Sequence, residues 1–126
     1  MNSPTLRMLS LLLALCLMAA APAPVYAGRL ASLSGEAGDV EVRDEADFKL
    51  GDQSAVTVNY KAGKAADGCA VRISVYREQN GRWLHVNTVL RTNGNSNGSK
   101  DLTLPAGSYR IQVIAKQAKF DVNVDI

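Results

Sequence analysis

Residues 69–90 read CAVRISVYREQNGRWLHVNTVL, and this stretch decides the fold. Apolar and polar side chains alternate on both sides of Asn80-Gly81, which is the pattern of half-buried β-strands. Asn-Gly is the strongest short hairpin signal, because both residues of such a tight turn need positive φ. The stretch therefore predicts an antiparallel hairpin that turns at Asn80-Gly81.

A two-residue turn also fixes which residues of the hairpin lie opposite each other. The predicted cross-strand pairs, counted from the turn, are Gln79–Arg82, Glu78–Trp83, Tyr76–His85, Val75–Val86, Ile73–Thr88 and Val71–Leu90. The last three pairs bring the inward stripes of both strands onto one face. Because the two stripes were read separately, their agreement supports the hairpin.

Alternation of the same kind continues through most of the remaining chain. It is clear over residues 56–60, 102–113 and 118–126, and a shorter first strand is expected at 40–42. Residues 44–47 are acidic and resemble a turn, and residues 91–100 resemble a polar, glycine-rich loop. No segment after residue 27 has helical periodicity. We therefore predict an all-β fold, an antiparallel sandwich of about seven strands.

The first 27 residues have the composition of a secretory signal peptide. One positive charge, Arg7, precedes an apolar run over residues 9–21, and small residues stand at the two recognition positions of Val25-Tyr26-Ala27. The run has 13 residues, fewer than the roughly 20 that a membrane-spanning helix needs. We expect residues 1–27 to be removed, residues 28–39 to form a flexible lead-in, and residues 40–126 to form one β-sandwich domain. The mature chain is then expected to have no membrane span and to be secreted or periplasmic, with a bacterial origin favoured.

Residues 102–113 read LTLPAGSYRIQV, and they resemble a structural corner found in known β-sandwiches. The segment is similar to the leucine, glycine and tyrosine corner of fibronectin-III-like and immunoglobulin-like domains. It is also similar to an L-P-A-G-x-Y segment in β-sandwich domains appended to secreted bacterial proteases. The resemblance implies an immunoglobulin-like or fibronectin-III-like sandwich. It also implies that Gly107 is the turn residue and that the Tyr109 hydroxyl bonds a nearby backbone group.

The sequence offers no set of residues for catalysis, and none is predicted. His85 is the only histidine and falls on the outward face of the hairpin, whereas Cys69 falls on the inward stripe, so the two side chains should point apart. Cys69 has no cysteine partner after residue 27 and is read as a core residue, with a partly exposed, dimerising thiol as the alternative. Motifs of serine hydrolases and zinc proteases are absent.

Metal, cofactor and nucleic-acid binding are not expected either. The acidic residues between Asp39 and Asp47 match no calcium-binding spacing, and a solvated turn is favoured over a calcium site. The residues after 27 carry a net charge of only +1, too little for a surface that binds phosphate backbones. No cofactor and no metal site are predicted.

The outward face of the hairpin is the candidate binding surface. Tyr76, Trp83, His85 and Asn87 are expected to gather there. Aromatic rings beside hydrogen-bonding groups suit stacking against a sugar or a protein partner. Ordinary cross-strand pairing is the alternative reading of the same residues.

These observations predict a secreted, non-catalytic β-sandwich module that binds a glycan, a peptide or a partner protein. The alternative is a structural or accessory subunit that docks through its sheet edges and has no dedicated ligand site. An enzyme is the third and least favoured class.

Overall fold

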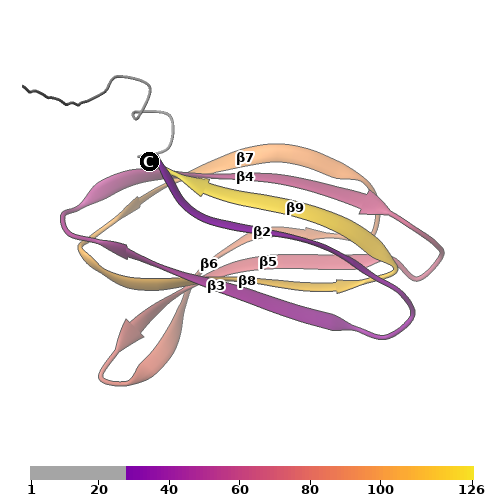
Figure 1. Cartoon of the computed structure of the whole chain (residues 1–126), viewed down its shortest axis with the longest axis horizontal. Coiled ribbons are helices and arrows are strands. Elements are labelled where there is room, and N and C mark those ends of the chain that lie inside the picture. The colour runs from indigo at the N-terminus through magenta and orange to yellow at the C-terminus, as the bar shows by residue number, and fades with distance from the viewer. Residues whose placement is uncertain (1–27) are drawn as a thin grey trace, which may run out of the picture.

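The computed structural model describes residues 28–126, which form two stacked β-sheets. The strands are β2 (Arg29–Ala37), β3 (Val42–Leu50), β4 (Ser54–Lys64), β5 (Ala70–Gln79), β6 (Arg82–Thr92), β7 (Ser96–Leu104), β8 (Gly107–Lys116) and β9 (Ala118–Asp125). Their orders are β2-β9-β4-β7 and β3-β8-β5-β6 (Figure 1). The predicted all-β antiparallel sandwich is confirmed, with eight described strands rather than about seven. The predicted signal peptide, residues 1–27, lies outside the described residues.

The strands pair like a single long hairpin that has been wrapped into two layers. β2 pairs with β9, β3 with β8, β4 with β7 and β5 with β6. Two further ladders, β4–β9 and β5–β8, join these pairs into the two sheets. This is the arrangement of an eight-stranded jelly roll. It differs from the immunoglobulin-like order that the corner motif implied, which divides its strands between sheets of four and three.

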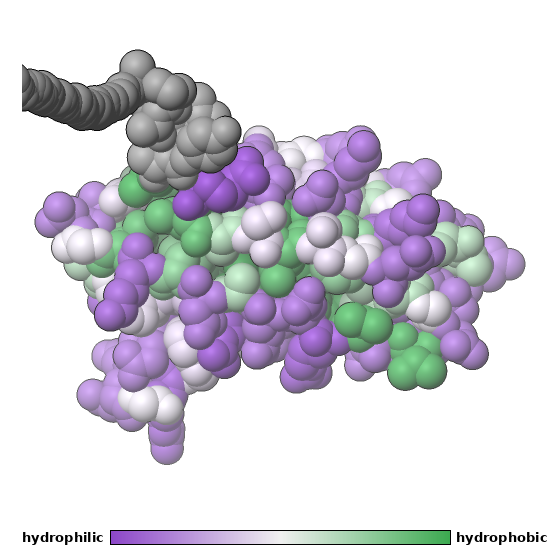
Figure 2. Space-filling model, viewed as in Figure 1, coloured by the Kyte–Doolittle hydropathy of each residue, from purple (hydrophilic) through white to green (hydrophobic). Residues whose placement is uncertain are grey.

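The core lies between the two sheets and is built from the alternation that the sequence shows. Val58 faces Val124 across one ladder, and Ile73 faces Val113 across another, and all four are at most 1% exposed. Figure 2 shows apolar residues along the seam between the layers and hydrophilic residues on either side. Full burial of one such side chain contributes about 1.5–3 kcal/mol, so these stripes are the main source of stability.

The β5–β6 hairpin has the predicted turn but only part of the predicted register. Asn80 and Gly81 have φ angles of 53° and 77°, and the pairs from Gln79–Arg82 to Tyr76–His85 are confirmed. Beyond Tyr76 the register shifts twice. The predicted pairs nearest the core, from Val75–Val86 onward, are therefore wrong: Val75 pairs with Asn87 and Ile73 with Leu90.

The two shifts are β-bulges, each of which adds a residue to β6. A bulge leaves one residue unpaired and bends the strand. Val86 is unpaired at the first shift and is 39% exposed, whereas its predicted position was in the core. The hairpin end beyond the bulge projects away from the sandwich (Figure 1).

The predicted flexible lead-in is wrong, because most of it forms β2. Residues 29–37 pair along β9, and Leu33 is only 7% exposed. The backbone of Gly35 packs closely against the ring of Phe120, because a Cβ at this position would be only 2.9 Å from the ring. The small residues of this segment give only a weak strand pattern. The segment forms a strand because it pairs with β9, which lies at the other end of the chain. The sandwich domain therefore includes residues before 40.

Two other segments read as turn and loop are also strands. Residues 44–47 lie within β3, which begins at Val42, and residues 96–100 lie within β7. Both are edge strands, whose polar side chains meet solvent and give weak period-two signals.

The corner before β8 is held by Tyr109. Its hydroxyl donates a hydrogen bond of 2.6 Å to the Pro105 carbonyl oxygen, and its ring is fully buried and stacks on Phe48 at 5.4 Å. Arg77 lies over Gly107, where a Cβ would be 3.1 Å from Nε, and it donates to the Ala106 carbonyl oxygen. The corner thus ties the chain before β8 to β3 and β5.

We expect Tyr109→Phe to lower the free energy of unfolding by about 1 kcal/mol at pH 7, because one hydrogen bond is lost. Burial raises the pKa of Tyr109, so its contribution is complete below about pH 10 and is lost as the pH rises through the raised value. Urea unfolding at pH 7 and pH 10.5 measures both effects. The difference in the free energy of unfolding between wild type and Tyr109→Phe should be smaller at pH 10.5 than at pH 7. Tyr60→Phe is the control, and an equal effect there would contradict the role of the corner.

Candidate functional site

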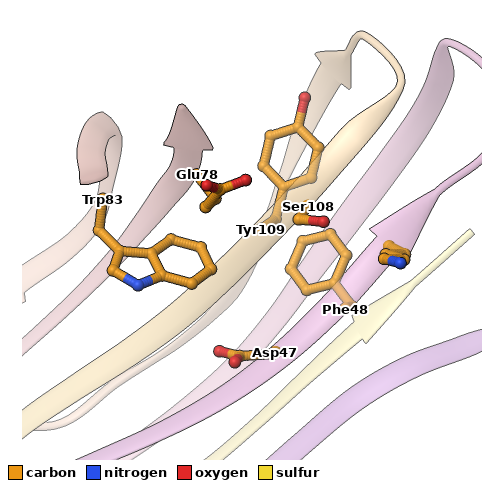
Figure 3. Close-up of a pocket in the computed structure, with 7 residues that line it drawn as sticks. Asp47, Phe48, Glu78, Trp83, Ser108 and Tyr109 are labelled. Carbon is orange, nitrogen blue, oxygen red and sulfur yellow. The ribbon is translucent and has the colours of Figure 1, made fainter. Parts of the chain in front are cut away.

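Three adjoining depressions follow the sheet β3-β8-β5-β6 along its outer face. The first, of about 520 Å³, lies at the base of the projecting hairpin (Figure 3), and six of its lining residues are Asp47, Phe48, Glu78, Trp83, Ser108 and Tyr109. The second, of about 320 Å³, shares Trp83 with the first. The third, of about 310 Å³, shares Arg72 with the second. We call these three depressions together the trough.

Strand register explains why residues distant in sequence meet in the trough. Asp47 pairs with Arg110, Arg110 with Tyr76, and Tyr76 with His85. These four residues therefore form one row across β3, β8, β5 and β6. Paired residues point to the same face of a sheet, so the whole row lies on the outer face.

Arg110 organises the middle of the trough. Its guanidinium donates two hydrogen bonds to Asp47, at 2.7 and 3.1 Å, and lies 3.6 Å from a Glu45 oxygen. The same group stacks over the Trp83 ring at 4.2 Å from its centre. A guanidinium held at both ends by carboxylates keeps its plane fixed. Trp83 is thus held against a positioned cation, and its indole reaches from the hairpin toward the sheet (Figure 3).

These ion pairs change the pKa values of both partners. Hydrogen bonding by Arg110 lowers the pKa of the Asp47 carboxyl, against an opposing effect of burial. The same hydrogen bond raises the pKa of Arg110. Both groups are therefore charged at neutral pH. Asp47 then holds the Arg110 guanidinium in place against the indole of Trp83.

Tyr76 and His85 meet beside this group. Their rings are 5.7 Å apart in an edge-on arrangement. The Tyr76 hydroxyl donates to Gln112 Oε1 at 3.3 Å, and His85 Nε2 lies 2.9 Å from Thr88 Oγ1. The structure thus brings together three of the four predicted binding residues, Tyr76, Trp83 and His85.

Asn87 is not brought into the trough. The bulge at Val86 sets it opposite Val75, which faces the core, so its side chain lies on the inner side of the strand. Its Oδ1 is buried and has no hydrogen-bond partner within residues 28–126. The predicted register had no bulge, and this is why Asn87 was placed on the outer face.

Sequence reasoning missed the residues that support Trp83. Asp47 and Glu45 were read as part of a turn, and Arg110 was considered only as part of the corner segment. All three lie on β3 and β8, whose places beside β5 follow from the sheet order. Glu45 and Asp47 are two residues apart, and this spacing, which places both on one face of a strand, could have indicated a strand instead of a turn.

Cys69 and His85 lie apart, on the two faces of the sheet. Cys69 is 4% exposed and belongs to the core, while His85 is exposed. Residues 28–126 contain no group of three or more His, Cys, Asp and Glu side chains placed to hold a metal ion. No helix in that range is long and apolar enough to cross a bilayer.

Comparison with known proteins shows the fold and no family. No family model and no curated protein matches the chain. The pre-peptidase C-terminal domain of a collagenase from Bacillus anthracis superposes with a TM-score of 0.52 and 13% identity, over 77% of this chain and 90% of that one. A protein from Sulfurospirillum deleyianum superposes with a TM-score of 0.48 and 10% identity, over 76% and 96% of the respective chains. The chain is thus similar to a β-sandwich domain carried by a protease, and the similarity is one of fold.

We expect the emission of Trp83 to respond to the charge of Asp47. It is the only tryptophan of the chain, so its fluorescence reports on the trough alone. In wild type the emission should stay constant from pH 7 to about pH 4 and shift to the red as the pH falls through the lowered pKa of Asp47. Asp47→Asn should show red-shifted emission already at pH 7.

The matched control is Asp101→Asn, which removes a carboxylate that accepts a hydrogen bond from Thr57 on the other sheet. It should keep the wild-type emission at pH 7 and the wild-type acid transition. An unchanged acid transition in Asp47→Asn would contradict the proposed support of the indole.

Proposed function

We propose that the chain is an exported, non-catalytic β-sandwich module that binds an extended saccharide along the trough. One observation carries the proposal: the sole tryptophan stacks on a fixed guanidinium inside a depression that adjoins two others. A flat aromatic ring that is already immobilised loses little entropy when a ligand stacks on it. Export rests on residues 1–27 of the sequence.

The chemistry around Trp83 suits a polyhydroxylated ligand. Carboxylates of Asp47 and Glu78 accept hydrogen bonds, and the Ser108 hydroxyl both donates and accepts. A sugar ring has an apolar face, which can stack on the indole of Trp83. The hydroxyl groups around the sugar can then hydrogen-bond to the carboxylates and the hydroxyl that border the indole. The length of the trough favours a chain of sugars over a single one.

Docking through sheet edges is the second class of function, and three of the four sheet edges argue against it. β6 carries two bulges, which interrupt pairing with a further strand. β7 presents Lys100 and Asp101, and β3 presents Arg43 and Lys49, all exposed. Charged side chains and bulges are the means by which proteins block pairing at a sheet edge.

The binding proposal predicts that Trp83→Ala weakens saccharide binding roughly 10–100-fold, because a central aromatic contact carries about 2 kcal/mol or more. Isothermal calorimetry against neutral and acidic oligosaccharides measures it without needing the indole signal. The control is Leu84→Ala: Leu84 is next in sequence and pairs with Arg77, so it points to the opposite face of the hairpin. Equal affinity of wild type and Trp83→Ala, or no binding of any saccharide by wild type, would refute the proposal.

The export proposal predicts a mature N-terminus at Gly28. Expression of the full chain in a bacterial host, followed by intact-mass measurement of the periplasmic fraction, should show loss of residues 1–27. Ala27→Leu puts a large residue at the recognition position and should leave the precursor uncut. A full-length chain in the cytoplasm of the wild-type strain would be the opposing result.

A further inference from the structure

We infer that the saccharide is acidic and that Arg43, Arg72 and Arg91 bind its anionic groups. We call these three residues the arginine row. The inference rests on the proposed function, since it names the class of saccharide that the trough takes.

Strand register and lining place the arginine row where the second depression meets the third: Arg43 and Arg72 line the second, and Arg72 and Arg91 line the third. Arg43 pairs with Ile114, Ile114 with Arg72, and Arg72 with Arg91. The row therefore crosses all four strands on the outer face of the sheet. Ile114 stands between two arginines and is only 8% exposed, which fits cover by their aliphatic stems with the charged ends in solvent.

The arginine row brings like charges together. Arg72 and Arg91 lie directly opposite each other, and like charges in that position destabilise a sheet. Within residues 28–126 none of the three arginines forms a salt bridge. The stems of these arginines help the fold by covering Ile114, and Arg43 adds charge to the β3 edge. Neither role explains why Arg72 and Arg91 stand opposite each other, so the benefit of that pair is sought in binding.

One arginine on each sheet has carboxylate partners. Arg110, four residues before Ile114 on β8, is paired with Asp47 and Glu45. Arg29 on the opposite sheet is paired with Asp125. Most other cations within residues 28–126, such as Lys49, Arg77 and Lys100, also form no salt bridge. What distinguishes this row is that two of its guanidiniums stand directly opposite each other on paired strands.

The third depression gives these charges a concave setting. Arg72, Arg91 and Lys116 line it, together with one carboxylate, Glu41, so cations outnumber anions three to one. A guanidinium fork matches the oxygen geometry of carboxylate, sulfate and phosphate groups. The depression is therefore suited to an anionic substituent rather than to a neutral hydroxyl.

The backbone distance between the two ends of the trough favours an elongated ligand. Glu78, opposite Trp83, and Arg72 are six residues apart on β5, which corresponds to about 20 Å at roughly 3.3 Å per residue. An acidic polysaccharide combines sugar faces for Trp83 with repeated negative charges for the arginine row. Its uronate or sulfate groups are the shared chemistry that the row would recognise.

The test uses two pairs of probes that differ only in charge: hexagalacturonate with its methyl ester, and dextran sulfate with dextran. Wild type should bind the charged member at least tenfold more tightly at low salt, and added NaCl should reduce this preference. Arg72→Gln should lower affinity for the charged member about tenfold and leave that for the neutral member unchanged. Arg82→Gln, an equal charge change at the exposed hairpin tip, should leave both affinities unchanged.

A stability measurement separates binding from a structural role. Arg72→Gln removes the repulsion with Arg91, so its Tm should equal or exceed that of wild type. A lowered Tm would assign Arg72 to the fold instead and would overturn the inference.

The experiment separates failure of the acidic-saccharide inference from failure of saccharide binding itself. If neutral and charged members bind equally through Trp83, or if Arg82→Gln is as damaging as Arg72→Gln, the inference fails and the proposed function stands. If no oligosaccharide or polysaccharide of either pair binds, both fail. If single-stranded oligothymidylate binds through Arg72 more tightly than either acidic saccharide, the ligand class is wrong.

Discussion

The cross-strand register of the sheet β3-β8-β5-β6 is the constraint on which the rest depends. Paired residues share a face, so one register decides both what enters the core and what stands in the trough. Ile73 and Val113 meet on the inner face because of it, and Arg110 and Tyr76 meet on the outer face for the same reason. A slip of one residue would exchange the two sets. The hydrophobic core thus guarantees the arrangement of the polar surface above it.

Features set by neighbouring residues could be predicted from the sequence. The turn at Asn80-Gly81 and the first pairs of the hairpin follow from local geometry, and the long alternation ending at Ile126 shows a strand buried on one face. Features set by distant partners could not. β2 is defined by its ladder with β9, and β3 by its ladder with β8, and neither has a strong pattern of its own. The tyrosine corner occurs in more than one kind of sandwich, so it indicates layers but leaves their strand order open.

The candidate site shows the same division. Tyr76, Trp83 and His85 lie within a few residues of one turn, and counting from that turn brought them together. Asn87 lies beyond a bulge, which adds a residue that no alternation rule counts. Arg110 and its carboxylates come from other strands, so their contact with Trp83 depends on the order of strands in the sheet. One part of the trough is therefore encoded locally by the hairpin, and the other part is encoded by the order of strands in the sheet.

The ladder between β2 and β9 also sets how the domain carries mechanical load. Gly28 and Ile126 are joined by a backbone hydrogen bond of 2.7 Å, at the open end of an antiparallel pair (Figure 1). A force that draws these two points apart acts on the rungs one after another, in the manner of a zipper, instead of shearing them together. Tension would therefore peel β2 from the sandwich at low force, before it reaches the layer that holds the trough.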